Sequence, residues 1–200
     1  GCLADTIAIF VTITAPTGTT QLITNKNITG TTSGGTFGYN AFLVSPAGAP
    51  NFSVNPIAIP SGQTFGTNTT PVSLSSGSAF YNLIETLPAV PGWAVTNVAC
   101  SVSGEGGTGI WNGSNAINGV KISYGKTTTC SWTNKYSQPT ISTAPNPTSG
   151  AVGTPISDKA TLSGGNSPTG TIIFRLYDPS NLNCSPGIGP AYTSPPVNVT

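Results

Sequence analysis

The chain has 200 residues, of which only 6% are charged, and its formal net charge is +1. That balance provides no basic surface for binding nucleic acid, and no apolar run approaches the roughly 20 residues of a transmembrane helix. Histidine is absent and the five acidic residues are scattered, so acid–base and nucleophilic catalysis lack their usual groups. We therefore expect a protein that is not an enzyme and that needs no metal or other cofactor.

Short strands account for the pattern of apolar residues. Apolar side chains make up 36% of the chain and recur in alternating runs, whereas helical spacing is nowhere sustained over about a dozen positions. In chain order, strands are expected at residues 6–14, 37–44, 57–59, 78–87, 93–102, 120–124 and 127–133. Gly125 and Lys126 are expected to join the last two as a hairpin. These runs predict an all-β protein built as a β-sandwich.

The most distinctive pattern lies between residues 81 and 134. It consists of a Tyr-x-Leu-x-Glu-Thr run from Tyr81 to Thr86, followed by Pro88, Gly92-Trp93, Cys100 and Cys130-Ser-Trp132-Thr-Asn134. This order resembles the C-terminal half of a prealbumin-like β-sandwich, the B-type module of Gram-positive pilins and collagen-binding surface proteins. The resemblance covers residues 5–136 and implies a first domain, residues 1–136, of the kind that builds stalks and fibres.

Glu85 is expected to lie in the core of that domain. Alternate residues of a strand share one face, so Glu85 points the same way as Tyr81 and Leu83. The resemblance implies that this Glu assists an amide crosslink between a Lys on the first strand and an Asn on the last strand. Asn134 fits the last-strand position.

The crosslink is nevertheless expected to be absent. The expected first strand, residues 7–13, carries no Lys. Lys26 or Lys121 could replace the missing Lys only with a different strand register. We therefore predict that Glu85 is a buried, hydrogen-bonded carboxylate without a chemical role.

A disulfide is expected to take the place of the amide. Cys100 and Cys130 each lie on the apolar face of an expected strand, and we predict that the two thiols meet across the sandwich. The bond would stabilise the fold by about 3.5 kcal/mol in the chain-entropy model, and it indicates an oxidising, extracellular location. Metal binding by these residues is disfavoured, because the chain has no CxxC motif and no His.

A second domain, residues 137–200, is expected after a boundary at residues 136–139. Residues 145–174 resemble the start of an immunoglobulin-like repeat found in bacterial and archaeal surface proteins. Only four strands are expected, at residues 140–143, 156–163, 171–177 and 191–200, whereas an immunoglobulin-like sandwich needs about seven. Either downstream sequence or a strand from another subunit must complete this domain.

The N-terminal run of residues 7–13 is a candidate for that donated strand. Ile7, Ile9, Val11 and Ile13 alternate along it. The competing expectation is that this run is the first strand of its own domain, where the family resemblance puts it.

Two cysteines remain after the first pair. Cys184 stands where the resembled repeat has a Cys that bridges to the missing segment, so its expected mate is Cys2 of a neighbouring molecule or a Cys beyond residue 200. A lipid anchor on Cys2 is the other interpretation. Sequons for N-glycosylation occur at Asn27, Asn51, Asn68, Asn112, Asn183 and Asn198.

These observations predict a secreted structural protein of the cell surface that self-associates into a filament or stalk. The alternative is an adhesin that binds glycan or host matrix through the loop at residues 104–118, where Trp111 could stack on a sugar. Trp93 and Trp132 are expected to lie in the core instead.

Overall fold

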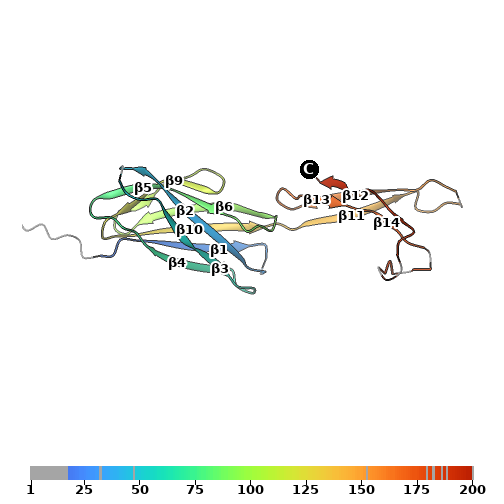
Figure 1. Cartoon of the computed structure of the whole chain (residues 1–200), viewed down its shortest axis with the longest axis horizontal. Coiled ribbons are helices and arrows are strands. Elements are labelled where there is room, and N and C mark those ends of the chain that lie inside the picture. The colour runs from blue at the N-terminus through green and yellow to red at the C-terminus, as the bar shows by residue number, and fades with distance from the viewer. Residues whose placement is uncertain are drawn as a thin grey trace, which may run out of the picture.

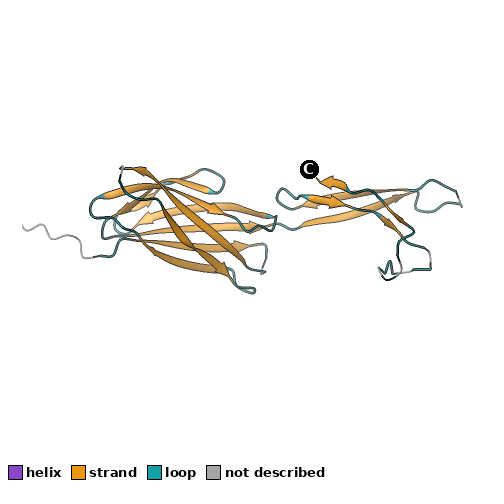
Figure 2. Cartoon of the chain, viewed as in Figure 1, coloured by secondary structure: helices purple, strands orange, loops and turns teal. Residues whose placement is uncertain are grey.

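The computed structural model describes residues 18–199 apart from 32, 47, 152, 179, 182, 186 and 188. These residues form strands, turns and loops, which confirms the all-β class (Figure 2). Strands β1 to β10 build a β-sandwich, here called the first module (residues 18–136), and strands β11 to β16 build the second module (residues 139–199). The two follow one another along the long axis of the molecule (Figure 1). No described residue belongs to a helix that could cross a membrane.

The first module consists of two five-stranded sheets. One has the order β4-β1-β10-β6-β7, with β4 at Phe65–Pro71, β1 at Gln21–Thr29, β10 at Thr127–Tyr136, β6 at Trp93–Val102 and β7 at Gly106–Thr108. The other has the order β3-β2-β5-β9-β8, with β3 at Phe52–Ile59, β2 at Gly35–Ser45, β5 at Ser78–Thr86, β9 at Ala116–Ser123 and β8 at Ile110–Trp111. Strands β1 and β10 pair in parallel, whereas the other pairings in both sheets are antiparallel.

The core lies between the two sheets and follows the alternation of side chains. Every second residue is buried along the middle of β1, β5 and β10. Trp132 and Tyr81 are the largest of the fully buried side chains. Three polar residues, Lys26, Glu85 and Asn134, occupy inward positions in the same alternation and are equally buried.

A bulge in β6 brings Trp93 into this core. The register between β10 and β6 shifts between Thr133 and Asn134, so that no residue of β10 stands opposite Thr96 in the ladder. An extra residue reverses which side chains face inward. Val98 and Cys100 are therefore buried on one side of the bulge, and Trp93 is buried on the other.

The expected first strand, residues 7–13, lies outside the described residues, and β1 lies next to the central strand β10. The expected hairpin through Gly125 and Lys126 is wrong, because β9 pairs with β5 and β8 whereas β10 pairs with β1 and β6. The turn at Gly125 carries the chain from one sheet to the other.

The second module follows β10 after only two residues, Ser137 and Gln138. Its strands are β11 (Pro139–Asn146), β12 (Ser157–Gly164), β13 (Gly170–Ile172), β14 (Arg175–Leu176), β15 (Tyr192–Thr193) and β16 (Val197–Val199). They pair as three separate two-stranded sheets, β11-β12, β13-β16 and β14-β15. Six large apolar side chains remain 43–60% exposed, namely Ile141, Ile156, Ile173, Leu176, Tyr192 and Val197. Among the described residues, this module therefore has no closed apolar core.

Candidate functional site: a buried lysine, glutamate and asparagine

Three strands bring Lys26, Glu85 and Asn134 together in the core of the first module. Lys26 lies on β1 and Asn134 lies on β10, and the parallel register of these neighbouring strands pairs Lys26 with Trp132 and Ile28 with Asn134. Glu85 reaches them from β5 of the facing sheet. Relative exposures of 0% for Lys26, 1% for Glu85 and 0% for Asn134 place all three out of contact with water.

The Glu85 carboxylate contacts both of the other side chains through one oxygen. Lys26 Nζ donates a hydrogen bond to Glu85 Oε1 at 2.5 Å, and Asn134 Nδ2 donates to the same oxygen at 3.1 Å. The ammonium and the carboxamide are thus held on either side of one acid. Ion pairing explains how a Lys and a Glu can be buried at all, since an isolated charge there would be very costly.

Aromatic rings surround this cluster and exclude water from it. Lys26 Nζ lies 4.6 Å from the ring centroid of Phe37 and 6.0 Å from that of Trp132. Tyr39 is the cross-strand partner of Glu85 on β2, and its ring lies 5.3 Å from that of Trp132. Such an environment has a low dielectric constant and disfavours charge on every group in it.

Burial moves the pKa values of Lys26 and Glu85 toward each other. Desolvation lowers the pKa of Lys26 from 10.5 to about 8, although the charge of Glu85 and its hydrogen bond oppose this shift. Desolvation likewise raises the pKa of Glu85, against the opposing effects of Lys26 and Asn134. Both shifts favour the pair in which Lys26 is a neutral amine and Glu85 is a neutral acid.

Two further polar groups lie beside the Glu85 carboxyl. Asn134 Oδ1 is buried and has no hydrogen-bond partner, and the Tyr39 hydroxyl is buried and interacts with Glu85. Buried polar atoms without partners are uncommon in proteins, and they often mark reactive sites. A neutral amine next to a carboxamide, with a carboxylic acid bridging the two, has the groups needed for acyl transfer from the carboxamide to the amine.

Lys26 was expected to take part only with a different strand register, and β1, a strand not predicted from the sequence, places it beside β10. The residues around it alternate, with Leu22, Thr24, Lys26 and Ile28 all buried. A Lys on the inward face of an alternating run was the available signal. The other candidate, Lys121, lies away from the cluster and pairs with Glu105 Oε2 at 2.7 Å, where both side chains are partly exposed.

Cys100 and Cys130 form a disulfide in the first module. The bond does not cross the sandwich, which corrects the expected geometry. The two residues face each other directly on the neighbouring strands β6 and β10, with 4.0 Å between their Cα atoms. Strand β10 is therefore joined to β6 by the disulfide at Cys130. Two inward-facing positions after Cys130, the same strand holds Asn134 beside β1.

The surroundings of the other cysteines and of the tryptophans can be compared with the predictions made for them. Cys184 is free and exposed, and Cys2 lies outside the described residues. Trp111 is half-buried against the core, and its Nε1 donates to the Ser114 carbonyl oxygen at 2.6 Å. Trp93 and Trp132 are buried, as expected.

The sequons differ in accessibility. Asn51, Asn112, Asn183 and Asn198 are exposed, whereas Asn27 and Asn68 are half-buried on strands β1 and β4. The Asn112 side chain accepts hydrogen bonds from the backbone of Ser114 and Ala116.

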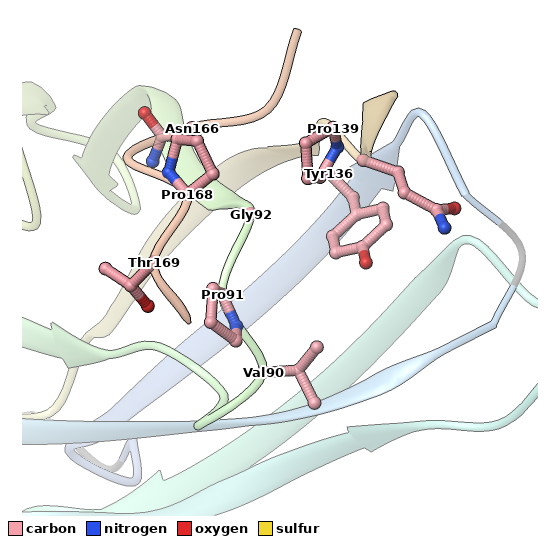
Figure 3. A pocket seen from close by; sticks show the side chains of 9 residues that line it. Val90, Pro91, Gly92, Tyr136, Pro139, Asn166, Pro168 and Thr169 are labelled. Atoms are coloured by element: carbon pink, nitrogen blue, oxygen red, sulfur yellow. The ribbon is translucent and has the colours of Figure 1, made fainter. Parts of the chain in front are cut away.

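A cavity of about 260 Å³ lies where the two modules meet. It is lined by Val90, Pro91, Gly92, Tyr136, Gln138, Pro139, Asn166, Pro168 and Thr169 (Figure 3). Asn166 Nδ2 donates to the Trp93 carbonyl oxygen at 2.8 Å and so ties the second module to the first. The lining contains no charged side chain, and we assign the cavity to the packing of the junction.

The fold and the buried cluster define a β-sandwich with the components of an internal amide crosslink. No family model matches this chain, and no curated protein matches it in sequence. Among solved structures, a mutant of the major pilin from Streptococcus pyogenes matches 60% of this chain and 48% of its own, with 16% sequence identity and a TM-score of 0.31. The chain thus spans about half the length of that pilin. This likeness is too weak to support an argument, so the function rests on the site itself.

Proposed function

We propose that this chain is a structural subunit of an extracellular filament or stalk, whose first module is locked by an amide between Lys26 and Asn134. The observation that carries the proposal is the placement of both side chains on one buried carboxylate oxygen, Glu85 Oε1. This replaces the expectation that Glu85 has no chemical role, which depended on the absence of a Lys from the first strand.

The reaction is an internal acyl transfer. Lys26 passes a proton to Glu85 and becomes a neutral amine, whose Nζ attacks the Asn134 side-chain carbonyl carbon. Glu85, which already contacts Asn134 Nδ2, then gives its proton to that nitrogen as the bond from Nδ2 to the carbonyl carbon breaks. The amine also loses its remaining extra proton through Glu85, and one ammonia leaves. An amine and a carboxamide are converted to a secondary amide and ammonia, and no oxidant or reductant is needed.

The position of the amide suits a protein that bears tension. Load would enter the first module through β1 and leave it through the end of β10, which continues into the second module after two residues. These two strands are parallel neighbours over nine residue pairs, so pulling would shear them apart. An amide between Lys26 and Asn134 would connect the two loaded strands directly.

The disulfide supports an extracellular location, because such bonds persist in oxidising compartments. Glycans on the exposed sequons Asn51, Asn112, Asn183 and Asn198 would hydrate a chain that has no charged residue between positions 27 and 84. A mass decrease on enzymatic deglycosylation of native material tests this part of the proposal.

Assembly by β-strand complementation between subunits is the second part of the proposed function. Its support is the second module, which exposes six large apolar side chains on three separate two-stranded sheets. Cys184, which is exposed and free, would then bond to Cys2 of a neighbouring subunit or to another Cys of the filament.

Intact mass measurement under denaturing, reducing conditions tests the amide. The parent chain is expected to be lighter than its sequence by one ammonia. Asn134→Ala and Lys26→Met are each expected to have the full sequence mass, and Lys135→Met, an exposed neighbour of Asn134, is expected to keep the loss. Asn134→Asp can form the same amide with loss of water. A parent chain of full sequence mass refutes the crosslink.

A further inference from the structure

The second module offers an apolar face that no described residue covers. In the β11-β12 sheet, Ile141 pairs with Leu162 and Thr143 pairs with Ala160 on one face, whereas Thr140 pairs with Ser163 on the other. The first face is apolar, yet the Ile141 side chain is 54% exposed. Among the described residues, β11 and β12 pair only with each other, so each leaves one edge of backbone N–H and C=O groups free. An extended apolar segment is the partner that satisfies both the edge and the face.

The N-terminal run of the same sequence has the matching chemistry. Residues 7–13 alternate Ile7, Ile9, Val11 and Ile13 with smaller or polar residues and one Phe, and residues 6–25 contain no charged side chain. Neither edge of β1 is left for this run within its own module, because β1 is already paired with β4 and β10.

The run cannot pair along its whole length with the second module of its own chain, because its Ile13 end cannot reach that module. Thr20 lies beside Gly125, just before β10 begins, because the Gly125 N–H donates to Thr20 Oγ1 at 2.8 Å. The second module begins beyond the other end of β10, whose ten residues span about 33 Å. Fully extended, the chain from Gly18 to Ile13 covers at most about 18 Å. The start of β1 and the second module accordingly lie at opposite ends of the first module (Figure 1).

We propose that residues 7–13 of one copy add a strand to the β11-β12 sheet of a second copy. This inference rests on the proposed function and names the donor, the acceptor and the partner of the filament contact. Because the donor and acceptor surfaces are different and lie at opposite ends of the molecule, the contact is heterologous and propagates head to tail. Each subunit then completes the next one.

The test uses the full chain with two pairs of variants. Val11→Asp places a charge on the alternating apolar face of the donor, and Thr12→Asp places the same charge on its other face. Ile141→Asp alters the apolar face of the acceptor, and Thr140→Asp alters the polar face of the same strand. Light scattering and electron microscopy measure the assembly state of each chain.

The parent and the two Thr variants are expected to form head-to-tail polymers, and Val11→Asp and Ile141→Asp are expected to be monomers. Mixing these two monomers is the decisive step. One retains an intact acceptor and the other an intact donor, so the mixture is expected to form 1:1 dimers and nothing longer. Circular dichroism on each variant establishes that the first module remains folded.

Any one of three results overturns the inference. These are a parent that stays monomeric at all concentrations, a Val11→Asp chain that polymerises like the parent, and a mixture that stays monomeric. A second module completed by further sequence of its own polypeptide would give the first of these results. The amide is measured separately by mass, so polymers without ammonia loss refute the crosslink alone, and ammonia loss without polymers refutes the strand exchange alone.

Discussion

Lys26 Nζ and Glu85 Oε1 lie 2.5 Å apart at a point where neither side chain is exposed to solvent. A buried ion pair of this kind contributes little net stability when its desolvation is counted. Glu85 Oε1 also accepts a hydrogen bond from the Asn134 carboxamide, so the pair lies beside the carboxamide of the proposed crosslink.

Replacing Glu85 with Gln is expected to prevent amide formation, because Gln cannot take the proton from Lys26. The chain should then have its full sequence mass. Its free energy of unfolding should fall by about 4–5 kcal/mol, the chain-entropy value for opening a loop of roughly 100 residues. Intact mass and urea denaturation measure the two effects. Glu105→Gln is the matched control, since Glu105 is a partly exposed residue paired with Lys121 and Lys126, and it should leave the crosslink intact.

The pH dependence of stability is expected to differ between crosslinked and uncrosslinked chains. In Asn134→Ala, Lys26 remains an amine whose pKa is lowered by burial to about 8 in the folded state, against 10.5 for the ordinary group. The unfolded state then binds more protons between these values, so the free energy of unfolding rises with pH. The rise is expected above pH 8, where the folded Lys26 amine loses its proton and the unfolded one keeps it.

The parent should lack that rise, because an amide nitrogen does not titrate in this range. The double variant Lys26→Met, Asn134→Ala should lack it as well and serves as the control for all other groups. Denaturant unfolding at a series of pH values makes the comparison. Equal slopes for the parent and Asn134→Ala would show that Lys26 is still a free amine in the parent.

The disulfide is expected to act as a reserve crosslink under tension. Cys100 and Cys130 lie within the loop that an amide between Lys26 and Asn134 would close, so in the crosslinked chain the disulfide bears no load. When the amide is missing, the load passes through the disulfide. The disulfide then prevents the residues between the two cysteines from extending. These cysteines are 30 positions apart, which corresponds to about 100 Å of extended chain.

Single-molecule pulling on the full chain should therefore show no extension of the first module in the parent, with or without reductant. Asn134→Ala should extend, and its contour length should increase by a further 100 Å or so when reductant is present. Cys100→Ser combined with Cys130→Ser in the Asn134→Ala background reproduces the longer extension without reductant. A contour length of Asn134→Ala that is independent of reductant contradicts this prediction.

The junction between the modules is expected to loosen in Asn166→Ala. This change removes the hydrogen bond from Asn166 Nδ2 to the Trp93 carbonyl oxygen, which contributes about 1 kcal/mol. Small-angle scattering should report a broader distribution of end-to-end lengths, with no change in the melting of the first module. Asn146→Ala, a change on β11 away from the junction cavity, is the control.

The predicted strands and the inward position of Glu85 came from alternation, which is a local property of the chain. Lys26 was expected to take part only with a different strand register, because residues 7–13 are richer in β-branched apolar side chains than Gln21–Thr29 and so gave the stronger strand signal. Which strands become neighbours is decided by tertiary packing. The expected hairpin at Gly125 and the expected cross-sandwich geometry of the Cys100–Cys130 bond failed for that reason, since alternation specifies the face of a side chain but not its sheet.

The most direct test of the account is tandem mass spectrometry on a proteolytic digest of the parent chain. The account predicts a branched peptide in which the segment containing Lys26 is joined through its side chain to the segment containing Asn134, with the loss of one ammonia. Recovery of both segments only as separate, linear peptides of full mass would contradict it.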